Sequence, residues 1–270
     1  MLFRSGVFLT ALAFATVASA AAEPRSPTAK WNVHFADAQC IAHRDYGTAD
    51  NPLRLVLKAP AVGDVTQVGV MREAGPSLPQ QVDSIVTIDG RPPLKTNLLM
   101  YTPKGSKERL YLLNMPSADF ASVRRSKTLS VRSEGLNETF ALSEMEPLLK
   151  VVDECVADLR RVFNVDATVP EPSKFKRRAS ADIYRFFSDA DYPRAAILKE
   201  QSGRVGFALL IGEDGRVADC TIVATSGVPS LDSQACALLK SRAKFRPALG
   251  LDGKPAKDSK VGGINWRMPD

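Results

Sequence analysis

The chain has 270 residues, enough for one large domain or two ordinary ones, and its 36 basic and 30 acidic side chains give a formal net charge of +6. With 44% hydrophobic and 24% charged residues, its composition is typical of a globular protein and excludes a largely disordered one. The small positive excess comes without interleaved aromatic and basic residues, so nucleic acid is not an expected partner.

Residues 1–20 predict an export signal that is removed from the mature chain. Arg4 precedes an apolar run from Val7 to Val17, and Ala18-Ser19-Ala20 has the small residues that signal peptidase recognises. The run is shorter than the roughly 20 residues that a membrane-spanning helix needs. We therefore expect an exported, soluble protein. The alternative is that this segment remains as an inner-membrane anchor and the rest of the chain faces the periplasm.

Residues 23–163 are expected to form a β-rich domain. Short runs of alternating or β-branched residues are separated by Gly, Pro, Asn and Asp, which is typical of strands joined by turns. The runs that most clearly predict strands are residues 53–59, 67–72, 84–89, 108–114 and 127–133. No motif in this domain indicates its function.

A long amphipathic helix over residues 143–163 is expected to close this domain. Its apolar side chains recur at intervals of three and four residues, as one face of a helix requires; they are Leu148, Val152, Cys155, Leu159 and Val162. An even number of cysteines in an exported protein favours disulfides, and Cys40 is the natural partner of Cys155. In the chain-entropy model a bond that closes so long a loop stabilises the fold by about 4–5 kcal/mol.

The sequence shows no motif of a catalytic or metal-binding site. His34, Cys40 and His43 do not have a standard spacing of metal ligands, and the chain has just two histidines. A nucleophile elbow, an HExxH helix and a phosphate-binding loop are all missing from the sequence. We therefore expect no metal, no cofactor and no enzymatic activity. An enzyme with an unrecognised site in residues 31–163 is the least favoured alternative.

Residues 164–188 are expected to be a linker. They contain Pro170 and Pro172, many small polar residues and a basic cluster within residues 174–178, and they show little apolar periodicity. We interpret the basic cluster as part of a solvated connector. Contact with anionic groups of the cell envelope is the alternative.

Residues 189–270 predict a small α+β unit in the order helix, strand, strand, helix, strand. Pro193 stands where a helix over residues 192–203 would begin. Asp214-Gly215 then joins two apolar-rich strands, because a hairpin turn needs a positive φ. A second helix and a last strand over residues 260–268 complete the unit.

Cys220 and Cys236 stand on the second strand and the second helix of this unit. Cys220 shares a strand face with small residues, the face that a returning helix would cover. A disulfide between the two would contribute roughly 3 kcal/mol in the chain-entropy model. A redox dithiol is the alternative, but such pairs usually have the spacing Cys-x-x-Cys. We expect a structural disulfide.

Residues 189–268, approximately, resemble the C-terminal domain of TonB-family proteins. The features that carry the resemblance occur in the family's order, and they are Tyr192-Pro193, Gly203 with Val205, Asp214-Gly215 with Val217, Ser226-Gly227, Leu231-Asp232, Phe245 with Pro247-Ala248, and Gly253 with Pro255. The expected fold class of the chain is therefore α+β, with a β-rich N-terminal domain closed by a long helix and followed by a small TonB C-terminal-like domain.

The resemblance implies a protein of the Gram-negative periplasm that binds a segment of an envelope or outer-membrane protein. In the family this segment is added as a strand to the edge of the domain's sheet. The residues expected to bind the partner are Tyr192, Pro193, Val261, Ile264 and Trp266. Peptidoglycan is a second candidate partner, and an open sheet edge also allows a homodimer.

The front of the chain departs from the pattern of an energy transducer of this family. Such a protein needs a retained anchor helix and a long Pro-rich span, whereas the linker here has two prolines. We therefore expect binding in envelope transport or assembly without force transduction. A membrane-anchored TonB-type energy transducer for outer-membrane receptors is the alternative.

Overall fold

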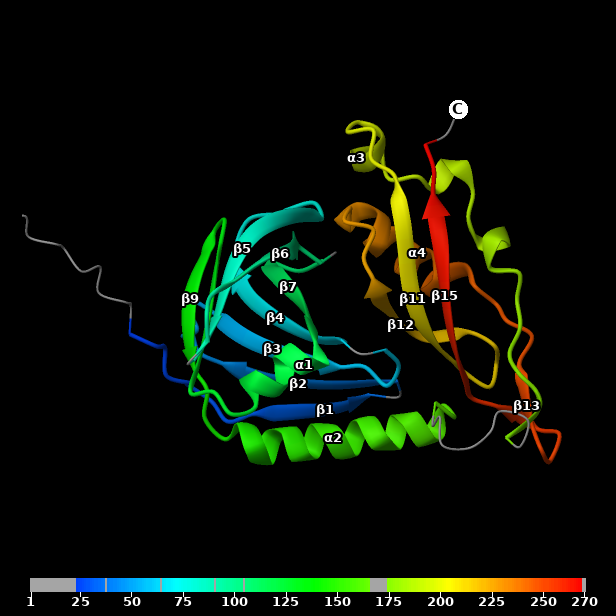
Figure 1. The fold of residues 1–270 in the computed structure, drawn as a ribbon, viewed down its shortest axis with the longest axis horizontal. Coiled ribbons are helices and arrows are strands. Elements are labelled where there is room, and N and C mark those ends of the chain that lie inside the picture. Colours follow the sequence, from blue (N-terminus) through cyan, green and yellow to red (C-terminus); the bar gives the residue numbers. More distant parts are fainter. Residues whose placement is uncertain are drawn as a thin grey trace, which may run out of the picture.

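The protein folds into a large β-rich body and a smaller α+β unit beside it (Figure 1). The structure is a computed structural model, and it describes residues 23–36, 38–63, 65–89, 91–103, 105–165 and 174–268. The export signal expected over residues 1–20 lies outside the described residues. Within the described ranges, no helix is both long enough and apolar enough to cross a membrane.

The β-rich body is one sheet of nine antiparallel strands in the order β1-β2-β3-β4-β7-β6-β5-β8-β9. The sheet curls so that one face encloses a core (Figure 1). Its strands are β1 Asn32–Ala36, β2 Gln39–Asp45, β3 Leu53–Ala59, β4 Val65–Glu73, β5 Gln80–Ile88, β6 Leu94–Tyr101, β7 Glu108–Pro116, β8 Thr128–Ser133 and β9 Leu136–Ala141.

Alternation along each strand decides which side chains reach the core. In β3, Leu53, Leu55 and Leu57 are buried while the residues between them are half-buried, which is the period of two that a pleated strand imposes. The largest side chains enclosed by the sheet include Tyr111 and Phe140, both fully buried. All five strands expected from the sequence are present, and β1, β2, β6 and β9 were not expected.

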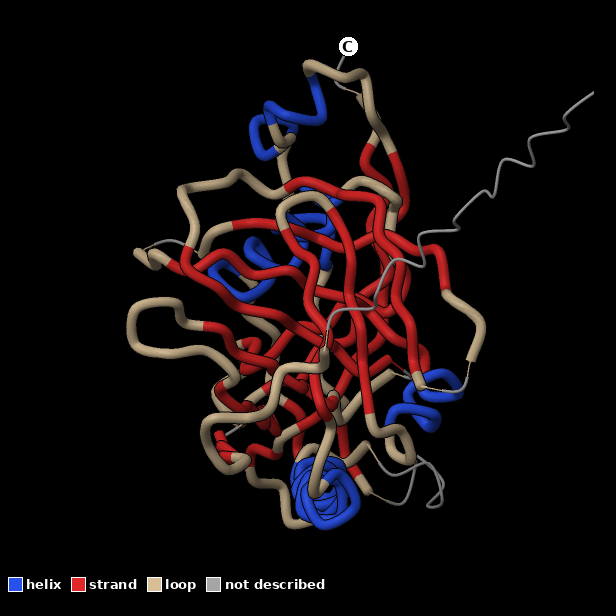
Figure 2. The backbone as a smooth tube through the Cα atoms, turned by 90° about the vertical axis from the view of Figure 1, so that its left-hand side faces the viewer, coloured by secondary structure: helices blue, strands red, loops and turns tan. Residues whose placement is uncertain are grey.

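Helix α2, Met145–Val162, follows the sheet and lies along the side formed by β1 and β2 (Figures 1 and 2). A short helix α1, Ser117–Val123, connects β7 to β8. The apolar stripe of α2 is buried except for Val162, which is exposed because it stands in the last turn. Cys155 bonds to Cys40 of β2, with 6.0 Å between the two Cα atoms. This disulfide joins α2 to the sheet.

The smaller unit contains a three-stranded sheet in the order β12-β11-β15, with α4 packed on one face. A second small sheet has the order β10-β13-β14. The elements are β10 Phe175–Arg177, η2 Ile183–Phe186, η3 Asp189–Asp191, α3 Arg194–Ile197, β11 Gly203–Ile211, β12 Val217–Ala224, α4 Pro229–Arg242, β13 Ala248–Gly250, β14 Pro255–Ala256 and β15 Asp258–Trp266.

Two segments differ from the sequence expectation. The helix expected over residues 192–203 is the single turn α3, since Ala196 is its one buried residue and so short an apolar contact cannot support a longer helix. Residues 174–188 were expected to be a linker, but they supply β10 and η2, and Phe175 is buried in the core of the smaller unit. Their apolar side chains cover that core.

The hairpin between β11 and β12 turns at Gly215, as the sequence predicts. Gly215 has φ 79°, and a Cβ atom there would lie 2.1 Å from the carbonyl oxygen of Phe245. Glycine is therefore required at this position for two reasons: the backbone is left-handed there, and the chain that follows α4 leaves no room for a side chain.

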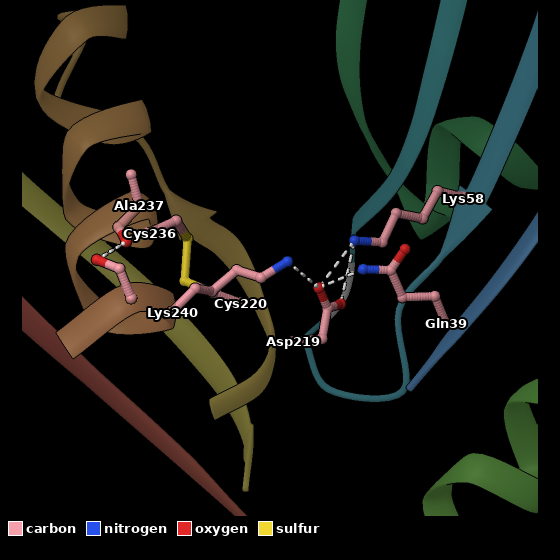
Figure 3. Close-up of a disulfide and its surroundings, with 8 residues drawn as sticks. Gln39, Lys58, Asp219, Cys220, Cys236, Ala237 and Lys240 are labelled. Carbon is pink, nitrogen blue, oxygen red and sulfur yellow. Dashed lines mark hydrogen bonds and ion pairs between the residues drawn. A yellow bond between two sulfur atoms is a disulfide. The ribbon is translucent and has the colours of Figure 1, made fainter. Parts of the chain in front are cut away.

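The sheet face of the smaller unit opposite α4 contacts the α2 region of the β-rich body. Leu210 of β11 is buried in a cluster with Cys155, Leu159 and Phe163 of the α2 region. Beside it, the carboxylate of Asp219 is 5% exposed and contacts the β-rich body (Figure 3). Apolar burial and a buried charge therefore fix the two parts against each other.

Candidate partner-binding edge

Strand β15 is the outer strand of its sheet, on the side away from the nine-stranded sheet (Figure 1). It pairs antiparallel with β11 along its whole length, from Gly203 opposite Trp266 to Ile211 opposite Asp258. An outer strand has one row of backbone N–H and C=O groups without a strand partner. This edge is the surface at which a further strand could add.

The first two residues of β15 are covered by the chain that precedes η2. The side chain of Asp258, almost fully buried, accepts hydrogen bonds from the backbone N–H of Ala179 at 2.8 Å and from Arg178 Nε at 3.0 Å. Arg178 Nη2 also donates to the carbonyl oxygen of Ser259 at 2.9 Å. Within the described residues, the backbone of residues 260–266 makes no hydrogen bond beyond its pairing with β11. The open part of the edge is therefore residues 260–266.

The three apolar residues expected on this strand have different surroundings. Val261 is 63% exposed, whereas Ile264 and Trp266 are each 6% exposed and belong to the core of the smaller unit. Of the three, Val261 alone presents its side chain to a partner. The buried pair lies beneath the edge and holds β15 in place.

Tyr192 packs against Trp266, so the structure brings these two expected site residues together. Their ring centroids are 5.4 Å apart and the planes cross at 81°; Phe187 meets the same indole edge-on at 5.6 Å. The Tyr192 hydroxyl donates to the carbonyl oxygen of Gln201 at 2.7 Å. Among the described residues, the buried Nε1–H of Trp266 has no hydrogen-bond partner. Such a donor is costly to bury unpaired.

Pro193 is half-buried and comes between Tyr192 and the first turn of α3. The turn before it is held by Asp191, whose carboxylate accepts hydrogen bonds from the backbone N–H and the hydroxyl of Ser188, both at 2.8 Å. Arg242 Nη1 of α4 donates to the same oxygen at 2.7 Å. Asp191 therefore ties the aromatic cluster at the end of β15 to α4.

We expect this carboxylate to make stability pH-dependent in acid. The hydrogen bond from Arg242 is the main cause that lowers the pKa of Asp191 from 3.8 to about 2. Because the folded pKa is the lower one, the stabilisation is complete above about pH 4 and is lost as the pH falls to about 2. Asp191→Asn should therefore destabilise the protein at pH 6 and cost progressively less below pH 4. Urea unfolding of both proteins across pH 2–6 measures this difference.

Arg242→Gln provides the control, because it removes the main cause of the lowered pKa and keeps the carboxyl group. Its destabilisation relative to the wild type should also shrink between pH 4 and pH 2. A difference between wild type and Asp191→Asn that is the same at pH 6 and at pH 2 contradicts this role of Asp191.

The open edge carries positive charge. Arg204 of β11 and Arg267 after β15 are exposed, and Lys260 is half-buried within β15. Cationic side chains around an unpaired strand edge favour a partner segment with acidic residues.

Three groups that shape this edge were missed by the sequence reasoning. Arg178 was interpreted as part of a solvated basic cluster, although it anchors the start of β15, and Asp258 and Phe187 were not singled out. The one local signal was Asp258 itself, a carboxylate at the start of an apolar strand that must find a partner when it is buried.

The second expected disulfide lies away from the open edge. Cys220 of β12 bonds to Cys236 of α4, with 5.6 Å between the Cα atoms, and so fastens the helix to the sheet (Figure 3). No free cysteine is found in the described ranges, and they hold no group of three or more His, Cys, Asp and Glu residues suited to a metal ion.

Comparison with known proteins identifies the smaller unit. Residues 188–267 match the family model described as Gram-negative bacterial TonB protein C-terminal, which is under a third of the 270 residues. The resemblance found in the sequence is thereby confirmed, and it points to a TonB-like protein of the cell envelope. No curated protein and no solved structure gave a match.

Proposed function

We propose that this chain, whose residues 188–267 are a TonB C-terminal domain, is an exported periplasmic protein that binds envelope proteins by strand addition. The proposal takes residues 23–163 as a β-rich domain, 164–188 as the connection, of which residues 174–188 cover the core of the smaller unit, and 189–270 as the binding domain. The observation that supports it most directly is the open edge of β15 over residues 260–266.

Strand addition supplies affinity through the backbone and selectivity through side chains. An extended segment that pairs with residues 260–266 would meet Val261 as the exposed apolar contact and Lys260, Arg204 and Arg267 as charges. The expected partner is therefore a short, flexible segment of an outer-membrane or other envelope protein, with acidic and apolar residues. The family's C-terminal domain is non-catalytic, and we propose binding rather than catalysis.

Crosslinking in intact cells tests the proposal. A photoreactive amino acid at Val261 should give a discrete adduct with an envelope protein, and mass spectrometry should map the bond to a short segment of it. A synthetic peptide with that segment's sequence should bind the purified chain and compete with the adduct. Leu251, which is 59% exposed in the loop after β13, is the matched control position.

If the proposal is right, the yield of the crosslinked adduct depends on the β15 edge and on its positive charge. Lys260→Glu should reduce the yield of the Val261 adduct, whereas Lys260→Arg should preserve it, since the proposed partner segment is acidic. Equal yields from positions 261 and 251, or a mapped segment that binds the purified chain no better than a scrambled peptide, contradict strand addition at β15. An adduct with a second copy of this chain assigns the edge to a homodimer.

The state of the N-terminus separates a free periplasmic protein from an energy transducer. We propose that the chain begins at Ala21 after export and that it does not transmit force. N-terminal sequencing of the protein isolated from cells should give Ala21. A protein that retains residues 7–20 and stays with the inner membrane supports the membrane-anchored alternative.

A further inference from the structure

A cleft of about 490 Å³ lies between the β-rich body and the TonB C-terminal domain. One wall is the outer face of the nine-stranded sheet along β4, β7 and β6. The opposite wall is β12 with the first turns of α4, which lie on the side of the small sheet that faces the larger one (Figure 1). The volume is within the usual range of ligand sites. The cleft does not include β15.

Both walls of the cleft present apolar side chains, and the sheet wall also presents amides. Leu99, Leu112 and Tyr101 give the sheet wall an apolar surface, and Ile222 with the Cys220–Cys236 disulfide gives one to the opposite wall. Side-chain amides lie among the apolar groups of the sheet wall. These are Gln67, Gln81, Asn97 and Asn114, of which Gln67 donates to Asn114 at 3.1 Å. A ligand would therefore meet apolar surface and neutral hydrogen-bonding groups together.

The cleft is nearly free of charge, although the chain carries a net charge of +6. No Lys or Arg is among the described residues that line it, and its single acidic residue is Asp232. That carboxylate is buried and already accepts hydrogen bonds from Thr225 Oγ1 at 2.5 Å and from the backbone N–H of Ser226 at 2.9 Å. A charged ligand would lose its hydration without an opposite charge in return. The cleft therefore suits an uncharged ligand.

Among the described residues, strand β12 has no strand partner on its outer side, so this wall has a second open edge. In the order β12-β11-β15, β12 is the outer strand opposite to β15, and its Cys220 and Ile222 line the cleft. The row of N–H and C=O groups along such an edge matches the backbone of an extended peptide. A sugar chain lacks that alternation of donors and acceptors, so the strand edge favours a peptide over a glycan.

Contacts beside the cleft hold its two walls together. Asp219 of β12 accepts a hydrogen bond from Gln39 at 2.6 Å and forms an ion pair with Lys58 at 3.0 Å (Figure 3). Elsewhere α4 lies next to β5. A site whose walls are held in place before binding spends less conformational entropy on the ligand.

We propose that this cleft binds an uncharged, extended peptide segment of a partner protein, which adds to the free edge of β12. Its alternate apolar side chains lie against Leu99, Leu112 and Ile222, and the amides of Asn97 and Asn114 bind polar groups of the segment. The site is separate from the β15 edge and does not depend on the function proposed for it. The chain would then hold two protein segments at once.

A library of random 12-residue peptides displayed on phage, panned on the purified chain with both disulfides formed, is the probe. The enriched peptides should be uncharged, with apolar residues at alternate positions. Their affinity, measured by fluorescence anisotropy, should fall at least tenfold in Leu112→Arg and in Asn97→Arg. Asn97 is exposed, so Asn97→Arg should fold even if Leu112→Arg does not. Circular dichroism of both variants checks that they are folded.

Two controls separate this cleft from other surfaces. Leu251→Arg, at an exposed position outside the cleft, and Lys260→Glu, at the β15 edge, should leave the affinity within twofold of the wild type. The proposal is wrong if no peptide is enriched, if only charged peptides are, or if the enriched peptides keep their affinity for Asn97→Arg. Saturable binding of a muramyl glycan that Asn97→Arg abolishes, with no peptide enriched, assigns the cleft to a sugar and also overturns it.

Discussion

Replacing both Cys40 and Cys155 with alanine is expected to lower the free energy of unfolding by about 4–5 kcal/mol. The two cysteines are 115 residues apart, and in the chain-entropy model so long a loop gives a disulfide nearly its largest effect on the unfolded chain. Urea unfolding followed by circular dichroism measures the loss. We choose alanine because both side chains are buried and a serine hydroxyl would be left without a partner there.

The position of this disulfide adds a local effect. Cys40 and Cys155 belong to the buried cluster that also receives Leu210 from the TonB C-terminal domain. When α2 is no longer fastened to β2, that cluster loses its support. We therefore expect the double variant to expose the contact between the two parts to proteolysis at lower urea concentration than the wild type.

The disulfide of the C-terminal domain is the matched control. Cys220 and Cys236 are 16 residues apart, so removing both sulfur atoms should cost about 3 kcal/mol, less than the first pair. A smaller loss for the Cys40 and Cys155 variant than for this control contradicts the loop-length argument. Under reducing conditions all three proteins lack both bonds, so equal free energies of unfolding there confirm that the bonds, not the substituted side chains, cause the difference.

Asp219→Ala is expected to destabilise the protein by about 3 kcal/mol. The carboxylate is 5% exposed and pairs with Lys58, whose side chain is 18% exposed; Gln39 donates to the same group. Removing one member of a buried pair leaves the other charge uncompensated, which typically costs about 3–5 kcal/mol. The lower end applies here because the Lys58 ammonium keeps some contact with water.

A double-mutant cycle identifies the partner that matters. Lys58→Met combined with Asp219→Ala should recover much of the loss, since it removes the more buried of the two ammonium groups that pair with Asp219; the other, Lys240, is 45% exposed and stays hydrated. Asp158→Ala is the surface control: its pair with Arg161 on α2 is largely exposed and should contribute no more than about 1 kcal/mol. Additive losses for Asp219 and Lys58 contradict a direct interaction between them.

Asp219 also connects stability with the proposed peptide cleft. It is the residue before Cys220, so the ion pair that joins the two parts lies directly beside the wall that carries the disulfide (Figure 3). Asp219→Ala should therefore lower the affinity of the chain for the peptides selected for the cleft. It should not change the yield of the crosslinked adduct formed from position 261. Unchanged peptide affinity together with a reduced yield of the Val261 adduct would indicate that the peptides bind at β15.

Local patterns in the sequence were sufficient for strands with clear alternation and for α2. Strand β3 is an example, because Leu53, Leu55 and Leu57 alone specify its buried face. Strand β2 was missed because polar and charged residues interrupt its pattern. Arg44 lies on the inner face and is 5% exposed, and it is tolerated there because the carbonyl oxygens of Ala29 and Ser143 accept its hydrogen bonds.

At the candidate site, too, local sequence patterns predicted the elements but not which side chains are exposed. The sequence placed a strand over residues 260–268, close to β15, and placed Tyr192 near it through the family resemblance. It did not indicate that Ile264 and Trp266 are buried while Val261 is exposed. Which side chains of an outer strand reach solvent depends on what packs against each face, and here α4 and residues 183–187 come from elsewhere in the chain.

Neighbouring residues alone were sufficient to predict the local properties of this protein: the periodicity of strands such as β3 and of α2, the small-residue strand face that carries Cys220, and the TonB-type features of residues 189–268. These depend on neighbours within a few positions. Tertiary packing is what brings Arg178 onto the start of β15 and makes Asp219 and Leu210 join the two parts beside a cleft. Their partners come from other elements, and nothing within a few residues of them specifies which elements those are.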